Sequence, residues 1–306
     1  MRIGYPCINL SLDCRGDRTF RLKSYSEERL IATVRNNLEC LLEMLRYNSA
    51  RNILFFRITS DLVPFASHPV NQFNWPEHFK DEFKEIGSYV FDKGMRISMH
   101  PDQFIVINSP DTGVWERSLA ELVYHAIVLD AMELDISAKI QIHVGGVYGD
   151  KYGAISTFIE RYQGLPVSVR RRLVIENDDR LYTLSDCLQI GSECGIPVLF
   201  DTFHHQVNSS GEGLKQALEA AGGTWQPGDG LPMVDYSSQL PGMRSGQHAQ
   251  SLDEEDFRRF LTESKPHDFD VMLEIKDKEI SCIRAITLAR SDRRFVGEIR
   301  LLNGLQ

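Results

Sequence analysis

The 306-residue sequence lacks several features that would place it in whole classes of protein. Its six cysteines never form a Cys-x-x-Cys pair, which argues against a zinc ribbon or a thioredoxin-like redox site. A chain of this length needs no disulfide framework, so we expect all six cysteines to be reduced and structural. No apolar run approaches the roughly 18 residues of a membrane span, and the N-terminus has no apolar signal segment. We therefore expect a cytoplasmic protein that does not contact a membrane.

An excess of positive charge is also absent. Lys and Arg number 34 against 43 Asp and Glu, which gives a formal net charge of −9. This balance excludes a general basic coat of the kind that binds polyanions over a whole surface. It leaves room for a local basic face, and it allows some acidic residues to be metal ligands whose charge a cation offsets.

Short apolar runs of strand type alternate with helical patterns from one end of the chain to the other. Eight such runs favour an α/β fold, a single (β/α)8 TIM barrel spanning residues 1–306, over a doubly wound sheet. No Gly-x-Gly-x-x-Gly turn follows the first run, which weakens a dinucleotide-binding interpretation. The expected strands are 2–10, 52–60, 94–100, 139–144, 172–177, 197–202, 232–237 and 270–276.

Two helix starts are indicated by capping-box spacing. Ser24 lies three residues before Glu27, and Ser251 lies three residues before Glu254. After the first pair, Leu and Val recur every three or four residues, which is the spacing of one buried helix face. We therefore expect helices to begin near both serines.

Histidines and carboxylates stand at the carboxyl ends of the last six expected strands. In a (β/α)8 barrel these ends meet at the rim that carries the active site. Four acidic side chains gathered there would repel one another and lose hydration unless a cation compensated them. Divalent metals do so, and imidazole combined with carboxylate suits Zn, Mn or Fe. The expected ligands are His100, His143, Glu176, Asp201, His204, Asp235, His248 and Glu274.

This donor set is larger than one tetrahedral site needs, so we expect two or three divalent ions. Glu176 and Glu274 are the expected shared carboxylates, and we expect catalysis to depend on them and on His143. His68 is either a further ligand or, like Lys276, a residue that contacts the ligands from behind.

Two or three metals held by histidine and carboxylate suit the hydrolysis of a phosphodiester, because one ion activates water while the others stabilise the leaving oxygen. Basic side chains after the first, seventh and eighth strands, among them Arg15, Arg244 and Lys278, border the same rim and fit phosphate contacts. Divalent-metal sugar isomerases share the fold and use a mostly carboxylate site. The four histidines favour the hydrolase, with a sugar isomerase as the alternative.

Seven stretches of the chain, in order, resemble the ultraviolet damage endonucleases: GYPCINLSL, FRITSDLVPFASHP, ISMHPDQF, QIHVGG, IENDDR, FDTFHH and MLEIKDKE. The resemblance covers nearly the whole chain and is most specific in SDLVPFASHP and HPDQF. It implies a TIM barrel related to the endonuclease IV type of abasic-site nucleases, with a cluster of metals, commonly manganese, at the strand ends. The implied reaction nicks one strand of damaged double-stranded DNA 5′ of a pyrimidine dimer or 6-4 photoproduct. An abasic-site endonuclease is the alternative closest to it in chemistry.

The resemblance also implies roles for single residues. Tyr5 and Asn9 match family positions near the DNA, and Gln103 with Phe104 matches the pair that probes the damaged duplex. Manganese is the implied metal, with zinc or magnesium as the other divalent ions to test. Damaged DNA is the implied partner, no protein partner is implied, and the expected location becomes the cytoplasm with association to the nucleoid.

The chain departs from the family pattern at two places. Met233-Val234-Asp235 stands where family members often have Lys-x-His, and the family lysine can be carboxylated beside the metals. Methionine cannot replace that lysine, whereas aspartate can coordinate in place of the histidine with a change in site charge. Phe104 is tyrosine in some relatives, so the wedge is kept and a hydroxyl contact is lost.

Overall fold

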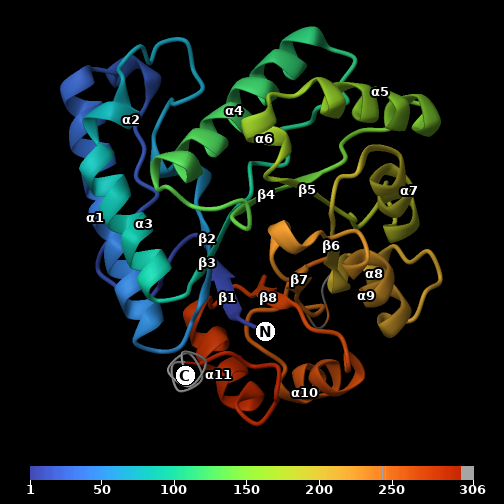
Figure 1. Cartoon of the computed structure of the whole chain (residues 1–306). Coiled ribbons are helices and arrows are strands. Elements are labelled where there is room, and N and C mark those ends of the chain that lie inside the picture. The colour runs from blue at the N-terminus through green and yellow to red at the C-terminus, as the bar shows by residue number, and fades with distance from the viewer. Residues whose placement is uncertain (241, 243, 245, 298–306) are drawn as a thin grey trace.

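The structure is a computed structural model, and it describes residues 1–240, 242, 244 and 246–297. Eight parallel strands pair in sequence order and close into a barrel (Figure 1). This confirms the expected (β/α)8 fold, although residues 298–306 of the expected single domain lie outside the described part. The strands are β1 (Ile3–Pro6), β2 (Phe55–Ile58), β3 (Arg96–Met99), β4 (Lys139–His143), β5 (Leu173–Glu176), β6 (Val198–Asp201), β7 (Met233–Tyr236) and β8 (Asp270–Leu273).

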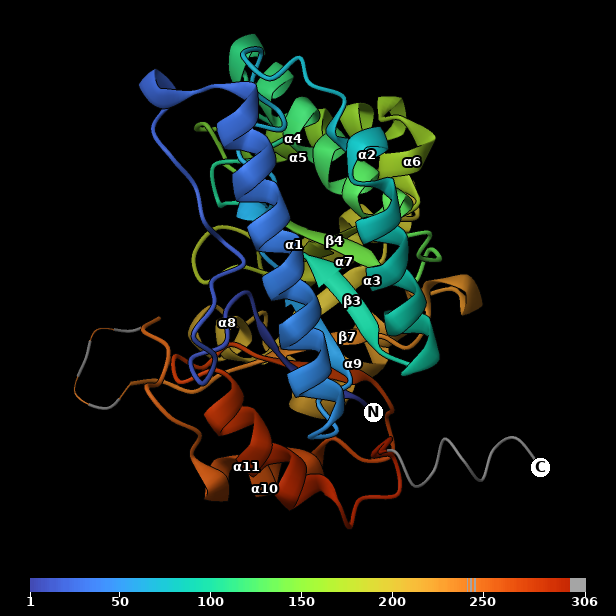
Figure 2. The same ribbon diagram turned by 90° about the vertical axis from the view of Figure 1, so that its left-hand side faces the viewer.

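The helices lie outside the barrel and connect its strands, and α1 and α3 run side by side in both views (Figures 1 and 2). Within the described part of the chain, no helix is long and apolar enough to cross a membrane. The helices are α1 (Glu27–Ser49), α2 (Trp75–His78), α3 (Lys80–Asp92), α4 (Thr112–Ala131), α5 (Lys151–Gly164), α6 (Val167–Arg170), α7 (Leu184–Cys194), α8 (Thr202–Val207), α9 (Leu214–Gly222), α10 (Glu254–Glu263) and α11 (Glu279–Ala289).

Each expected strand run contains one observed strand, and each observed strand is shorter than its run. Every run extends past the carboxyl end of its strand by at least one residue, and all except 139–144 and 270–276 also begin before its first residue. At the carboxyl ends the chain leaves the sheet to form the rim loops. After β3, for example, His100 is followed by Pro101, which has no N–H group to donate to a neighbouring strand. The residues just past the paired segments therefore lie on the rim.

The barrel interior is layered along its axis. Alternate residues of a strand face opposite sides of the sheet, so every second residue points inward. One inner layer is apolar and consists of Phe55, Val174, Leu199, Met233 and Met272, which pack together with Trp225. Two residues further along β2, β5, β6, β7 and β8, the inward positions are charged, and they are Arg57, Glu176, Asp201, Asp235 and Glu274. The charged residues at the rim therefore pack against an apolar layer in the barrel interior.

Both expected helix starts are wrong by two residues. α1 begins after Ser26, whose side chain accepts a hydrogen bond from the N–H of Arg29. α10 begins after Asp253, whose carboxylate accepts from the N–H groups of Glu255 and Asp256. Serine and aspartate are equally good N-caps, so a second cap residue two positions later can take over from the first.

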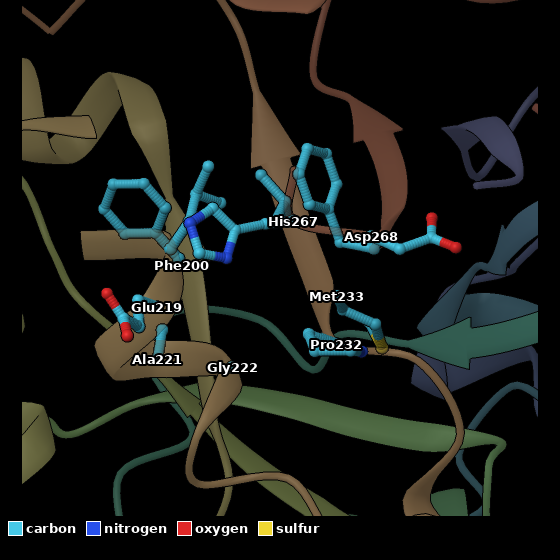
Figure 3. A pocket seen from close by; sticks show the side chains of 11 residues that line it. Phe200, Glu219, Ala221, Gly222, Pro232, Met233, His267 and Asp268 are labelled. Atoms are coloured by element: carbon cyan, nitrogen blue, oxygen red, sulfur yellow. The ribbon is translucent and has the colours of Figure 1, made fainter. Parts of the chain in front are cut away.

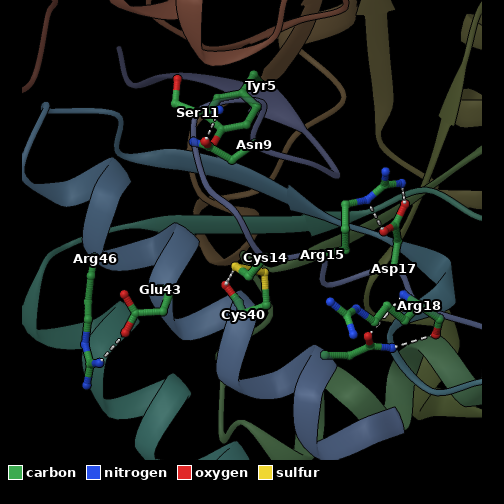
Figure 4. Close-up of a disulfide and its surroundings, with 11 residues drawn as sticks. Tyr5, Asn9, Ser11, Cys14, Arg15, Asp17, Arg18, Cys40, Glu43 and Arg46 are labelled. Atoms are coloured by element: carbon green, nitrogen blue, oxygen red, sulfur yellow. Dashed lines mark hydrogen bonds and ion pairs between the residues drawn. A yellow bond between two sulfur atoms is a disulfide. The ribbon is translucent and has the colours of Figure 1, made fainter.

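Cys14 and Cys40 form a disulfide, so the expectation that all six cysteines are reduced is wrong. The bond joins the loop after β1 to the middle of α1 (Figure 4). In the same loop, the side chain of Asn37 on α1 binds both the N–H and the C=O of Arg18. The remaining four cysteines are free. The loop that borders the rim is therefore fastened to α1 by a covalent bond and by hydrogen bonds.

We expect loss of this disulfide to lower the free energy of unfolding by about 3 kcal/mol, because the unfolded chain regains the entropy of an open loop. The loop spans a sequence separation of 26 residues. Urea denaturation of Cys14→Ser in non-reducing buffer, followed by circular dichroism, measures the loss. Cys194→Ser is the control, because its free thiol donates to the C=O of Ile190 and a hydroxyl can do the same. Equal midpoints for the two variants would show that the disulfide adds no stability.

Candidate functional site

Strand register brings the expected ligands onto neighbouring strands at one end of the barrel. His143 of β4 pairs with Glu176 of β5, and Asp201 of β6 pairs with Asp235 of β7. Paired residues of adjacent parallel strands lie side by side and face the same side of the sheet. Glu274 directly follows β8 and completes the arc. The expected convergence of ligand-type side chains on one rim is thus present.

Seven of the eight expected ligands form three overlapping groups, in each of which single donor atoms lie within 4.8 Å of one another. Glu176 and Asp201 each belong to two groups, so these two carboxylates are the ones placed to be shared, whereas Glu274 belongs to one group. The groups are His100, His143 and Glu176; Glu176, Asp201 and His204; and Asp201, Asp235 and Glu274. We refer to them together as the rim cluster.

His248, the eighth expected ligand, borders the rim cluster from the loop after β7. Its Nδ1 donates a hydrogen bond to the backbone C=O of Glu274 at 2.9 Å. This leaves Nε2 directed at the carboxylate of Glu274, 3.9 Å from Oε2. A backbone carbonyl that binds one ring nitrogen is a common way to orient a histidine whose other nitrogen binds a metal.

Four buried atoms of the rim cluster have no hydrogen-bond partner among the described residues, namely Nδ1 of His100, Nδ1 of His143, Oδ2 of Asp201 and Oδ1 of Asp235. Buried polar atoms are normally paired, so each of these atoms calls for a partner. Imidazole nitrogen and carboxylate oxygen are ligands that manganese, zinc and iron accept. The residues present therefore fit a centre of divalent metal ions.

The concentration of charge shifts several pKa values in the rim cluster. Burial raises the pKa of Asp201 to about 7 and lowers the pKa of His100 to about 4. Burial would also lower the pKa of His204, but the negative charges of Asp201 and Glu176 raise it to about 11. Such shifts are expected where carboxylates are crowded and desolvated, and a bound cation would relieve them.

Two buried residues that the sequence analysis missed contact the carboxylates of the rim cluster. Arg57 on β2 forms ion pairs with Asp235 and Glu274. Gln141 on β4 donates hydrogen bonds to Glu176 and Asp235. Arg57 is 3% exposed and Gln141 is fully buried. The sequence does carry a signal for both residues. Arg57 is a charged residue within the apolar run FFRI, and Gln141 is a polar residue within the run KIQIH, two positions before the expected ligand His143.

Asn177 is a third residue that the sequence analysis did not single out. Its side chain binds both the N–H and the C=O of Asp201, and its own C=O accepts from Nδ1 of His204 at 3.0 Å. Asp201 in turn caps α8, because its Oδ1 accepts from the N–H of His204 at 2.7 Å. The neighbouring His205 points elsewhere, and its Nε2 donates to the C=O of Glu212. Only one histidine of the pair therefore joins the rim cluster.

The two residue pairs expected at the DNA differ in exposure. Phe104, in the loop after β3, is 74% exposed. Tyr5 is fully buried between β1 and α1, where its hydroxyl donates to Asn48 at 2.7 Å and accepts from Asn9 at 2.8 Å. In this structure Tyr5 and Asn9 support the loop after β1, and their contact with DNA stays a prediction.

Two adjoining cavities open at the rim, and Gln103 lines both. The first, of about 440 Å³, lies over the rim cluster and is bordered by Lys276 and Lys278. The second, of about 620 Å³, is mostly apolar and is lined by Phe104 and His68, among others. His68 therefore lies beside the expected probing pair and outside the three ligand groups, and its Nδ1 accepts from the N–H of Val70.

Met233 lies below the rim cluster, in the apolar layer of the barrel. It also lines a small cavity at the amino-terminal end of the strands, together with residues that include Pro232 and His267 (Figure 3). Asp235, two residues further along β7, is the one that reaches the rim cluster. Met233 stands where family members often have a lysine. In this chain that position is therefore occupied by an apolar residue that packs in the barrel interior.

The chain is similar in sequence to UV DNA damage endonucleases over almost its whole length. A family model described as UV-endonuclease UvdE matches residues 1–298. A UV DNA damage endonuclease of Clostridium perfringens (strain 13 / Type A) is 38% identical over 288 residues, which cover 94% of this chain and 70% of that protein. A UV DNA damage endonuclease of Bacillus cereus (strain G9842) is 34% identical over 296 residues, covering 94% of this chain and 93% of that protein.

Solved structures show the same relationship and a wider fold similarity. The crystal structure of SacUVDE matches with a TM-score of 0.91 and 44% identity, covering 95% of this chain and 98% of that one. Endonuclease IV from Thermus thermophilus matches with a TM-score of 0.53 and 17% identity, covering 82% of this chain and 93% of that one. A D-psicose 3-epimerase matches with a TM-score of 0.54 and 14% identity, covering 82% and 92%. The last two share the fold with this chain.

We expect Mn²⁺ to raise the melting temperature of the wild-type chain, and Asp201→Asn to lose most of that rise. A ligand at 100 times its Kd stabilises the native state by about 2.7 kcal/mol. Folding raises the pKa of Asp201 from 3.8 to about 7, so at pH 8 the buried charge costs stability that a neutral amide does not cost. Asparagine also caps helices, so metal-free Asp201→Asn is expected to melt no lower than metal-free wild type.

Differential scanning fluorimetry with and without Mn²⁺ measures both effects. Asp253→Asn is the matched control, because Asp253 is also an N-cap aspartate but caps α10 and belongs to none of the three ligand groups. It is expected to keep the full response to Mn²⁺. A wild-type response to Mn²⁺ that Asp201→Asn retains in full would contradict a metal site at Asp201.

Proposed function

Because the chain belongs to the UV-endonuclease UvdE family, we propose that it nicks double-stranded DNA 5′ of ultraviolet photoproducts by metal-dependent hydrolysis of a phosphodiester. The proposed lesions are pyrimidine dimers and 6-4 photoproducts, and the proposed cofactor is two or three Mn²⁺ ions. The observation that carries the proposal is the rim cluster, whose unpaired buried ligand atoms lie beneath a cavity beside the exposed Phe104.

The cavity over the rim cluster fits a phosphate of the DNA backbone. Lys276 and Lys278 border it, so two cationic side chains offset the negative charge of the carboxylates at the place where a phosphate would enter. The chain as a whole carries a net charge of −9, which disfavours binding of intact DNA over a broad surface. Attraction to DNA is therefore concentrated at the cavity.

Divalent ions held by the rim cluster would polarise the phosphodiester and lower the pKa of a water molecule. Glu176, which belongs to two of the ligand groups, would be a ligand shared between them. Gln141 keeps one oxygen of Glu176 in place with a hydrogen bond, and His248 keeps its ring oriented through the backbone of Glu274. The chain thus contributes preorganised ligands, so little rearrangement is needed when DNA binds.

Recognition of the lesion would depend on the adjoining apolar cavity. Phe104 is exposed at its edge, and Tyr148, which is 50% exposed, lines the same cavity. A photoproduct weakens base pairing and stacking, so separating it from the helix costs less than separating intact bases. Gln103 lines both cavities and is placed to hold a displaced base next to the backbone phosphate that is cut.

The proposed activity places the protein in the cytoplasm, in association with the nucleoid, with damaged DNA as its macromolecular partner and with no protein partner. An abasic-site endonuclease and a divalent-metal sugar isomerase are the competing functions. The exposed aromatic Phe104 beside a cavity of about 620 Å³ favours a base over a sugar as the occupant.

We expect supercoiled plasmid to be converted to open circles only after ultraviolet irradiation and only with Mn²⁺, not with EDTA. His143→Ala and Glu176→Ala are expected to abolish this conversion, because each removes a member of the rim cluster. Agarose gels measure it, with Asp253→Asn as the active control. Absence of nicking by folded, metal-loaded wild type would contradict the proposal. Duplex with an abasic site and then ketohexoses would be tested next.

We expect Phe104→Ala to reduce the preference for irradiated over intact duplex by about tenfold, because stacking of a base on an aromatic ring contributes about 1–3 kcal/mol. Mn²⁺ binding is expected to stay unchanged, because Phe104 lies outside the ligand groups. Competition binding with irradiated and intact oligonucleotides measures the preference. Phe91→Ala is the control, since Phe91 on α3 is also exposed (84%) but stands away from the rim. An unchanged preference would remove the probing role of Phe104.

A further inference from the structure

Arg57 is a buried cation beside the carboxylates of the rim cluster, and it lines the cavity over that cluster. Its side chain is 3% exposed, and it extends inside the barrel from β2 towards β7 and β8. There it contacts Oδ2 of Asp235 at 2.7 Å, Oε1 of Gln141 at 2.8 Å and Oε1 of Glu274. A guanidinium presents its donors in a rigid planar fork, so these three contacts fix the positions of all three acceptors.

Arg57 uses one oxygen of Asp235 and leaves the other free for a different partner. Oδ2 of Asp235 accepts from Arg57 and also from Nε2 of Gln141, each at 2.7 Å. Oδ1 of the same carboxylate is buried and finds no hydrogen-bond partner in the described part of the chain. The carboxylate is therefore anchored by one oxygen, and the other is left available to a ligand such as a metal ion.

The two carboxylate oxygens of Glu274 likewise have different surroundings. Its Oε1 forms the ion pair with Arg57, while Oε2 lies on the side of His248, 3.9 Å from Nε2. Asp235 and Glu274 together with Asp201 form one of the three ligand groups. Two of the three carboxylates in this group are therefore held by the same guanidinium.

The influence of Arg57 extends to a third carboxylate through Gln141. Because Oε1 of Gln141 accepts from Arg57, its amide nitrogen must point the other way. That nitrogen donates to Asp235 and to Oε2 of Glu176. Arg57 thus determines the orientation of the amide that binds Glu176, which belongs to the other two ligand groups.

We propose that Arg57 is a positioning residue of the metal centre, which makes Asp235 and Glu274 one-oxygen ligands of the ion held by Asp201, Asp235 and Glu274. This inference rests on the metal centre of the proposed function. Without the fork, both carboxylates are free to rotate and to chelate through two oxygens or to turn away, so the ion loses a preformed site. Residues that hold metal ligands from behind typically contribute 10–100-fold to metal affinity.

Two variants separate positioning from charge. Arg57→Lys keeps the positive charge but cannot reach three acceptors from one planar group, and Arg57→Met removes the charge while filling similar space. If Arg57 positions the ligands, both variants weaken one step of Mn²⁺ binding by about 10–100-fold. If it acts only by charge, Arg57→Lys binds like wild type and Arg57→Met binds Mn²⁺ more tightly.

Isothermal titration of metal-free protein with MnCl₂ in the absence of DNA, together with electron paramagnetic resonance of free Mn²⁺, gives the number of ions and the Kd of each. Arg96→Lys is the matched control. Arg96 is also a buried arginine inside the barrel, but it pairs with Asp270 at 2.9 Å at the opposite end of the strands. It is expected to leave every Kd for Mn²⁺ within threefold of wild type.

Each outcome decides the inference. Weaker binding of one ion in both Arg57 variants supports it, whereas unchanged or tighter binding in either variant overturns it. A wild-type chain that binds no Mn²⁺ would overturn the proposed function as well, which distinguishes the two failures. If the Arg57 variants do not fold, Gln141→Leu replaces them, because it removes the amide that shares Asp235 with Arg57. Unchanged Mn²⁺ affinity in that variant would also overturn the inference.

Discussion

The rim of the barrel depends on one electrostatic constraint, the need to compensate four carboxylates that are crowded together and largely buried. An apolar layer that includes Phe55 and Met233 closes the barrel below them, so water cannot hydrate them from that side. Desolvated like charges are costly unless cations or hydrogen-bond donors face them. Arg57 supplies positive charge at the level of the carboxylates, and the cavity that it lines with the histidines is open to ions that enter from solution.

The positions of the expected ligands followed from the fold because a parallel barrel converts a place in the sequence into a place in space. The last residue of a strand lies on the rim, and pairing in register brings such residues from neighbouring strands together. His143 and Glu176, and likewise Asp201 and Asp235, are direct partners across two strand pairs. Residue type and strand end were sufficient to find the rim cluster.

Other features depend on information that the sequence pattern does not contain. Arg57 and Gln141 lie within short apolar runs, and whether such a residue points inward is known only once the strand bounds are known. The Cys14–Cys40 bond depends on the path of a loop, which no periodicity describes. Tyr5 belongs to a stretch that resembles a DNA-contacting motif, yet its place on β1 turns it outward to α1.

Asp201 has two duties that cannot be separated. It is the last residue of β6 and the cap of α8, with one oxygen bound to the helix backbone and the other 3.5 Å from Nδ1 of His204, without a hydrogen-bond partner among the described residues. His204, on the first turn of that helix, belongs to the same ligand group. The start of α8 and the positions of these two ligands are therefore fixed by the same residue, Asp201. An insertion or deletion between β6 and α8 would move a ligand, a cap and a helix together, so this junction has little freedom to vary in length.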